Sequence, residues 1–296
     1  MKHTVCAALV RSFSAVCLLA LLAGCGAPAA SGSSSAAAEQ SSGLLPEAGS
    51  AASSEVQPEV VSEAAGAGSA EASSDLEPEV QALTEEDVLD MAAGTVLTAE
   101  EMSGLDVDLL FTESALTDEV FARMEGVSYP EGCTVSRDDL RYLRVLHIGF
   151  DGEVHIGEMV CNKRISGDLL EIFRGLYDAA YPIEKMLLID EYGGDDEASM
   201  TDNNTSCFNY RVVSGSDHLS AHAYGLAVDV NPLYNPYVTS AGYFPTNAGD
   251  YVDRSADTPY KIDESDLCYQ LFTDHGFFWG GNWSSVKDYQ HFVMED

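Results

Sequence analysis

The chain of 296 residues carries 49 acidic and 14 basic residues, which gives it a formal net charge of −35. So large a negative charge argues against nucleic acid and anionic lipid surfaces as electrostatic partners. The composition is also uneven, because every aromatic residue after Phe13 lies C-terminal to residue 83. A folded core is therefore expected only in that later part of the chain.

The first 25 residues have the pattern of a targeting segment. Lys2 and Arg11 flank the start of an apolar stretch that ends at residue 22 and is too short to span a membrane comfortably. The stretch leads into Leu-Ala-Gly-Cys at residues 22–25, which resembles a bacterial lipoprotein signal. The resemblance implies that residues 1–24 are a signal peptide, that Cys25 receives the lipid, and that the protein is anchored on the extracellular face of the bacterial cell membrane. The alternative is an ordinary secretory signal in which Cys25 is incidental.

Residues 25–83 are predicted to be a disordered tether. This stretch contains nine acidic residues, no Lys or Arg and no aromatic residue. Too little apolar area is available to offset the entropy of ordering such a segment. As a coil it would span on the order of 40 Å, which suits a protein that reaches from the membrane into the cell wall.

Residues 84–296 are the length of a single domain, with 40 acidic and 12 basic residues and hence a net charge of −28. Four cysteines lie in this part, at positions 133, 161, 207 and 268. None is in a C-x-x-C pair, so a cysteine zinc site is not expected. Sequence leaves open whether they form disulfides or remain buried thiols.

The N-terminal part of the domain, residues 84–141, is predicted to be helical. A helix is expected over 84–91, with Thr84 as its cap and Asp87 at the capping-box position, and a second over 116–124 with Thr117 as its cap. Next, residues 140–162 are predicted to form a hairpin around Asp151-Gly152, a dipeptide that favours a type I′ turn.

The rest of the domain, residues 142–296, is predicted to mix strands and helices. Apolar residues at helical spacing predict a helix over 167–180, with Ser166 as its cap. Short strands are expected at 186–189, 208–213 and 226–230, and residues 193–206 are expected to be a solvated polar loop. The pattern indicates an α+β fold with a small antiparallel sheet and flanking helices.

Two segments distant in sequence contain the residues of a metal site. In SAHAYGLAVDV, residues 220–230, His222 and Asp229 are separated by small and apolar residues, and Gly225 gives the chain freedom to turn. A catalytic zinc needs three N or O ligands and an open position for water. The C-terminal DYQH supplies His291 as the third ligand and Asp288, three residues earlier, as an acid that could take a proton from water.

From about residue 142 to 294 the chain resembles the VanY-like D-alanyl-D-alanine carboxypeptidase family of zinc peptidases, which also contains L-alanyl-D-glutamate endopeptidases. The matching segments are NNTSCFNYR, SAHAYGLAVDVNPLYNPYV, and GFFWGGNW followed by DYQHF. The resemblance implies an α+β fold of the Hedgehog/D-Ala-D-Ala peptidase type. One departure is that the chain reads His-Phe-Val at 291–293, where family members commonly read His-Phe-Glu.

The resemblance also implies a role for each residue of the site. His222, Asp229 and His291 would bind Zn²⁺, and Asp288 would be the general base. Arg211 would stabilise the developing oxyanion or a substrate carboxylate, and Ser220 would contribute a hydrogen bond to the substrate or to the site. Other residues near these motifs have a structural explanation: His218 and His275, His147 and His155 on the hairpin, and Trp279 and Trp283, which could either line a groove or pack beneath it.

The implied activity is hydrolysis of peptidoglycan stem peptides by a monomeric D-alanyl-D-alanine carboxypeptidase. An L-alanyl-D-glutamate-type endopeptidase is the close alternative, because Asp288 is an aspartate, as in the endopeptidase-like members. A non-catalytic zinc-containing binding protein is the third possibility, since the Hedgehog signalling domain resembles this fold and keeps a zinc site without evident peptidase function. The presence of both Asp288 and Arg211 favours an enzyme.

Overall fold

The computed structural model describes residues 82–295. The predictions for the signal peptide, for Cys25 and for nearly all of the tether fall outside the described residues. Within residues 82–295, no helix is both long enough and apolar enough to cross a membrane.

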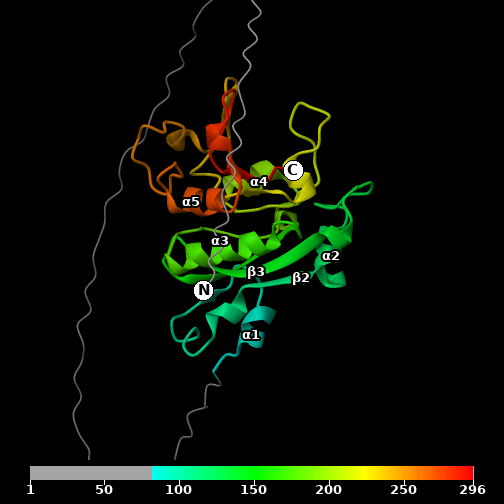
Figure 1. Cartoon of the computed structure of the whole chain (residues 1–296), viewed down its shortest axis with the longest axis vertical. Coiled ribbons are helices and arrows are strands. Elements are labelled where there is room, and N and C mark those ends of the chain that lie inside the picture. Colours follow the sequence, from blue (N-terminus) through cyan, green and yellow to red (C-terminus); the bar gives the residue numbers. More distant parts are fainter. Residues whose placement is uncertain (1–81, 296) are drawn as a thin grey trace, which may run out of the picture. The chain divides into compact units, whose positions relative to one another are not determined.

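The largest sheet is antiparallel and has four strands in the order β1-β4-β3-β2. Its centre is the predicted hairpin, in which β3 (Leu140–Ile148) pairs with β4 (Val154–Asn162) over the full length of both strands. The short strands β1 (Val96–Leu97) and β2 (Thr112–Ala115) form its two edges. Figure 1 shows β2 and β3 running beneath helix α3.

The hairpin is confirmed, but the predicted type I′ turn is wrong. Such a turn needs positive φ at both central residues, and only Gly152 has it, at 82°. The connection instead spans residues 149–153, closed by the Gly149 N–H donating to the Glu153 carbonyl. The Asp151 carboxylate accepts a hydrogen bond from the Glu153 N–H and contacts His155, so side-chain bonding determines the turn.

Helix α3 (Ser166–Asp178) packs on one face of this sheet through the predicted apolar stripe. Ser166 was expected to cap it but is its first helical residue, and its hydroxyl donates to the Lys163 carbonyl. On its other side α3 meets helix α5 (Leu267–Asp274), with Phe173 and Phe272 in edge-to-face contact at 6.3 Å between centroids. The main core therefore lies around α3, between the large sheet and the C-terminal part of the chain.

Residues 84–141 contain the two predicted helices and more. Helix α1 (Glu85–Asp90) has the Thr84–Asp87 capping box, and α2 (Asp118–Met124) is capped by Thr117, as predicted. The segment also supplies β1, β2 and the short helices η1 (Val107–Leu110) and η2 (Arg137–Asp139), and β3 begins before residue 142. It is therefore not purely helical, and it is continuous with the large sheet because its strands complete that sheet.

The C-terminal part forms two small antiparallel sheets of three strands each. One contains β5 (Ala227–Asp229), β10 (His291–Val293) and β8 (Phe278–Trp279); the other contains β7 (Gly242–Phe244), β6 (Tyr237–Thr239) and β9 (Lys287–Asp288). The helices here are short: η3 (Ile189–Tyr192), α4 (Asp196–Thr201), η4 (Ala221–Tyr224), η5 (Gly249–Tyr251) and η6 (Gly280–Asn282). The fold is thus α+β with small antiparallel sheets, as predicted.

Three local predictions for this part need correction. Residues 186–189 and 208–213 do not form strands. Each makes a single backbone bond to β4, from the Glu158 N–H to the Met186 carbonyl and from the Phe208 N–H to the Val160 carbonyl, and no continuous ladder forms. The predicted loop 193–206 contains helix α4, whose N-cap is Asp195. All four cysteines of the described part are free thiols, three of them buried, which answers the question that the sequence left open.

Candidate metal centre and active site

His222 is positioned by two local features, the N-cap and the C-terminal glycine of η4. The Ser220 hydroxyl accepts a hydrogen bond from the His222 N–H and caps η4. The helix ends at Gly225, whose φ is 66° and whose Cα faces the backbone so closely that a Cβ would lie 2.7 Å from the Asn162 nitrogen. Only glycine meets both demands. The chain therefore turns sharply from His222 into strand β5.

Asp229 and His291 face each other across two paired strands. They are directly opposite in the register of β5 and β10, so their side chains lie on the same face. Ala227 lies on this face of β5 as well, as the alternation along the strand predicts. The antiparallel pairing of β10 with β5 thus joins the two motifs that are 62 residues apart in the sequence.

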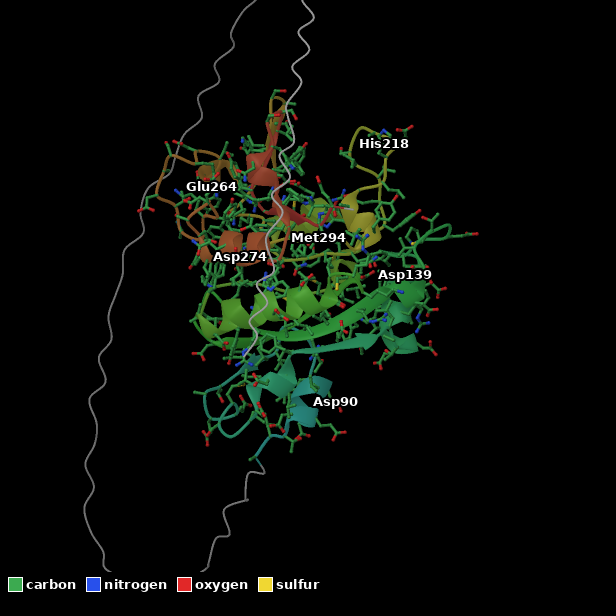
Figure 2. The ribbon with its side chains drawn as sticks, in the orientation of Figure 1. Asp90, Asp139, His218, Glu264, Asp274 and Met294 are labelled. Carbon is green, nitrogen blue, oxygen red and sulfur yellow. The ribbon has the colours of Figure 1, made fainter. Side chains whose placement is uncertain are left out.

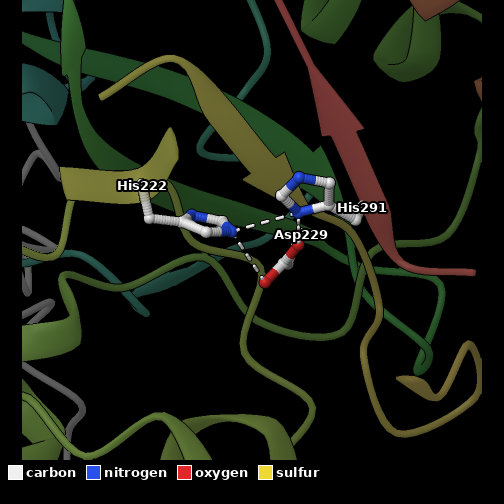
Figure 3. A group of neighbouring side chains, drawn as sticks. All are labelled: His222, Asp229 and His291. Atoms are coloured by element: carbon white, nitrogen blue, oxygen red, sulfur yellow. Dashed lines mark hydrogen bonds and ion pairs between the residues drawn. The ribbon is translucent and has the colours of Figure 1, made fainter. Parts of the chain in front are cut away.

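The three side chains converge on one point (Figure 3). The His222 Nε2 lies 3.2 Å from an Asp229 oxygen and 3.2 Å from the His291 Nδ1, and that Nδ1 lies 2.9 Å from the other Asp229 oxygen. Ligands about 2.0–2.1 Å from a tetrahedral zinc are roughly 3.3 Å from one another. The spacing of the three donor atoms therefore fits a zinc ion.

The tautomer of His222 also fits a metal. Its Nδ1 lies 2.7 Å from the Cys207 carbonyl oxygen, which can only accept, so Nδ1 carries the proton. The lone pair of Nε2 is then left pointing toward the other two donors. A hydrogen bond from the remote imidazole nitrogen to a backbone carbonyl is a common way to orient a metal-binding histidine.

The protonation states of His222 and Asp229 depend on each other. Burial disfavours charge on His222, but the Asp229 carboxylate outweighs it and raises the pKa of His222 above its ordinary value. Burial likewise opposes ionisation of Asp229, but the two histidines overcome it and lower the pKa of that carboxyl. A carboxylate that stays ionised beside two imidazoles is a suitable ligand set for a divalent cation.

Asp288 lies in β9, beside the centre. Gly280 packs closely against both Asp288 and His291. A Cβ at position 280 would be 2.8 Å from the Asp288 Cβ and 3.3 Å from the His291 Cβ. Gly280 of the segment GFFWGGNW therefore allows close packing against both residues. Burial raises the pKa of Asp288 to about 7, although His291 acts in the opposite direction. A carboxyl with a pKa near neutrality is suited to exchange protons with a substrate.

Gln290 is a site residue that the sequence analysis missed. It is 2% exposed, and its Nε2 lies 3.1 Å from an Asp288 carboxylate oxygen and 3.4 Å from the Met200 sulfur. Its Oε1 is buried without a hydrogen-bond partner among the described residues. The amide thus donates to the carboxylate of Asp288 and fixes its position. Its place inside D-x-x-H was the available signal, but a residue between two motif positions carries no chemical pattern of its own.

Arg211 is paired with Asp196, the first residue of α4. The second Asp196 oxygen accepts a hydrogen bond from the Asn209 amide at 2.9 Å. The guanidinium is close enough to the centre to lower the pKa values of His222 and Asp288, though it is not the largest influence on either. The structure therefore brings Arg211 toward the site, and a helix in the predicted loop orients it.

The short helix α4 makes contacts with several parts of the site. Besides the pair formed by Asp196, the Glu197 carboxylate accepts a hydrogen bond from the Thr246 N–H at 2.6 Å, just after β7. Met200 contacts Gln290, which in turn bonds to Asp288. We refer to α4 and these three contacts as the α4 support. The sequence analysis missed it because a polar segment of Gly, Asp and Asn is more often a loop.

The other histidines have positions consistent with structural roles or with plain exposure. His218, labelled in Figure 2, has a side chain that is 86% exposed, and the His275 Nδ1 bonds to the Leu271 carbonyl. His147 is buried, which lowers its pKa to about 4, and it bonds to the Ile183 carbonyl. His155 pairs with Asp151. None of the four belongs to the triad.

The two tryptophans differ. Trp279 is in the main core, and its indole N–H donates to the Tyr289 carbonyl, so packing explains it. The ring of Trp283 is half-buried and lies 5.3 Å from the ring of His291, centroid to centroid. Trp283 thus borders the metal centre. Ser220 is 6% exposed and its hydroxyl caps η4; a contact with substrate stays a prediction.

A cavity of about 680 Å³ lies elsewhere, between α2 and the face of β3 and β4 that is opposite to α3. It is lined by the ion-paired residues Arg123 and Glu158 and by Tyr142 and Arg144, among others. None of the predicted site residues lines it. The assignment of the site therefore rests on the convergence of side-chain donors.

Residues 214–294 match a family model described as D-alanyl-D-alanine carboxypeptidase. This segment includes the three donors of the triad as well as Asp288 and Gln290, whereas Arg211 and helix α4 precede it. No curated protein and no solved structure matches the chain. The resemblance seen in the sequence is thus confirmed for the C-terminal segment, where residues 214–294 are similar to the D-alanyl-D-alanine carboxypeptidases.

Proposed function

We propose that the protein is a zinc metallopeptidase that hydrolyses peptidoglycan stem peptides as a D-alanyl-D-alanine carboxypeptidase. The observation that supports it most is the convergence of the His222, Asp229 and His291 donor atoms at zinc-like spacing beside Asp288. The family matched by residues 214–294 agrees with this activity.

Each residue of the candidate site has a separate role in the proposed reaction. His222, Asp229 and His291 would hold a zinc ion, which would supply a Lewis acid able to lower the pKa of water toward about 7 and to polarise the scissile carbonyl. Asp288 takes the proton of the attacking water and passes it to the leaving amine. The Gln290 amide holds the carboxylate of Asp288 in place during both steps.

Arg211 supplies a positive charge for a negatively charged group of the substrate. Fixed by Asp196, it is oriented before the substrate arrives and loses little freedom on binding. It either binds the terminal carboxylate of the peptide or stabilises the oxyanion that forms in the transition state.

The endopeptidase is the alternative, because the acid in D-x-x-H is an aspartate, as in the endopeptidase-like members. We also propose that the protein acts as a monomer at the extracellular face of the cell membrane, anchored through a lipid on Cys25, and binds no nucleic acid. The lipoprotein-like residues 22–25 and the net charge of −35 support these proposals.

The test is incubation of the purified, zinc-loaded protein with defined muropeptides, followed by mass spectrometry of the products. A sample treated with a chelator and one reloaded with zinc are the controls. Loss of a single terminal alanine is the expected result, and release of the stem after its L-Ala would establish the endopeptidase instead. Stoichiometric zinc without any cleavage would reject the enzyme in favour of a zinc-containing binding protein.

A further inference from the structure

The strand that carries Asp288 is part of a sheet whose register aligns three side chains. Asp288 is directly opposite Tyr237 of β6, and Tyr237 is directly opposite Phe244 of β7. Residues opposite one another in antiparallel strands have their side chains on the same face of the sheet. Asp288, Tyr237 and Phe244 therefore form one row, which we call the aromatic row.

The rings of this row are exposed and held in place. Phe244 is 44% exposed and Tyr237 is half-buried, and their rings are nearly parallel, 25° apart with centroids 6.5 Å from each other. The hairpin is closed by the Thr239 hydroxyl bonding to the Gly242 carbonyl, and its C-terminal end is fixed to α4 through the Thr246 N–H. Exposed aromatic side chains held in this way are a typical binding surface.

The length of the row limits what can occupy it. Neighbouring strands are about 4.8 Å apart, so Phe244 lies roughly 10 Å from the base, measured across the sheet. An extended peptide covers about 3.3–3.6 Å per residue, so this distance corresponds to about three residues. A carboxypeptidase releases one residue only. The released residue is too short to reach Phe244. The aromatic row can therefore be occupied only by the part of the peptide that lies N-terminal to the scissile bond.

We propose that Tyr237 and Phe244 form a subsite for a long aliphatic side chain that ends in an ammonium group, on the retained part of the peptide. The methylene groups would lie on the rings, and the ammonium would face their π surfaces. The net charge of −28 over residues 84–296 favours a cation at this surface. This inference rests on the proposed function, since a peptidoglycan stem contains a diamino acid before its terminal alanines.

The experiment compares two synthetic peptides that end in D-Ala-D-Ala and differ in the preceding residue, which is lysine in one and alanine in the other. Wild type is expected to have a KM about fivefold lower for the lysine peptide, which is the size of an exposed cation–π contact plus some apolar contact. Phe244→Ala should remove this preference, because the KM for the lysine peptide should rise toward that for the alanine peptide.

Tyr243→Ala is the matched control. Tyr243 is the neighbouring residue of β7, is 37% exposed, and points to the opposite face of the sheet. It should keep the preference for lysine. A second variant, Phe244→Leu, retains apolar contact without the ring and should show an intermediate preference.

The outcomes separate the subsite from the proposed function. Cleavage of both peptides with equal KM by wild type, or an equal loss in Phe244→Ala and Tyr243→Ala, would overturn the subsite and leave the function intact. If neither peptide is cut, the proposed function fails. In that case calorimetry of the binding of the two uncut peptides tests the subsite separately. Equal affinity for the lysine and the alanine peptide would overturn the subsite as well.

Discussion

The metal triad and the α4 support contribute to the same site in different ways. The triad consists of side chains that point at one spot and are held by a cap, a glycine turn and one strand pair. The α4 support contains no proposed reacting group, yet it fixes Arg211, the β6–β7 hairpin and, through Gln290, Asp288. The residues proposed to bind the metal and those proposed to align Arg211 and Asp288 thus lie on separate segments, so substitutions should be able to separate metal binding from catalysis.

The largest effect is expected from removing a ligand. His222→Ala should abolish both zinc binding and hydrolysis, because two donors cannot hold the ion firmly and nothing else would activate water. Zinc content by mass spectrometry and peptide cleavage measure the two. The control is His218→Ala, an exposed histidine outside the triad, which should change neither. Activity in zinc-free His222→Ala would show that the triad is not the catalytic centre.

Replacing the base should come next. Asp288→Asn is expected to retain zinc and lose about 10²–10⁴-fold in kcat, the usual contribution of a general base. In the wild type, activity should fall as the pH drops through the pKa of Asp288, because only the carboxylate accepts a proton. Burial raises that pKa from 3.8 to about 7, and a bound cation lowers it, so the midpoint of the acid limb should lie between these values.

A pH profile of kcat/KM from pH 4 to 9 measures this midpoint. The acid limb should disappear in Asp288→Asn, leaving only residual activity. An unchanged acid limb in that variant would assign the titration to another group and remove the evidence for Asp288 as the base.

A smaller effect is expected from the α4 support. Asp196→Asn removes the ion pair that orients Arg211, so kcat/KM should fall by about tenfold to 100-fold while zinc content stays the same. Asp195→Asn is the matched control, since asparagine caps a helix about as well as aspartate and Asp195 does not contact Arg211. Loss of zinc in Asp196→Asn would contradict the separation of the two segments.

The smallest effect is expected at Gln290. Gln290→Met keeps the volume but removes the amide that donates to Asp288, so kcat should fall by about threefold to tenfold, the size of one hydrogen bond. The acid limb should also move to higher pH, because that hydrogen bond favours the charged carboxylate. Met200→Leu, which leaves the amide intact and removes only its contact with the sulfur, should change both much less than Gln290→Met does. A fall in kcat with an unmoved acid limb would point to packing alone.

Several features of the fold followed from local patterns. The capping box of α1 and the apolar stripe of α3 depend on residues within a few positions of one another. The hairpin was predicted because its strands are adjacent in sequence, but its turn was not, because the Asp151 side chain bonds to the backbone and to His155. The prediction of Ser166 as a cap was wrong for a similar reason, because its hydroxyl donates a hydrogen bond to the Lys163 carbonyl instead.

For this protein the sequence by itself predicted the donor set of the candidate metal site, because the chemistry of zinc restricts ligands to few residue types and the motif keeps them at fixed spacing. Only the tertiary structure decided what surrounds those donors. The polar segment that forms α4, the amide of Gln290 and the row from Asp288 to Phe244 come from long-range packing and strand register. Contacts between residues far apart in the chain leave no local pattern, because they depend on how separate segments meet in the folded protein.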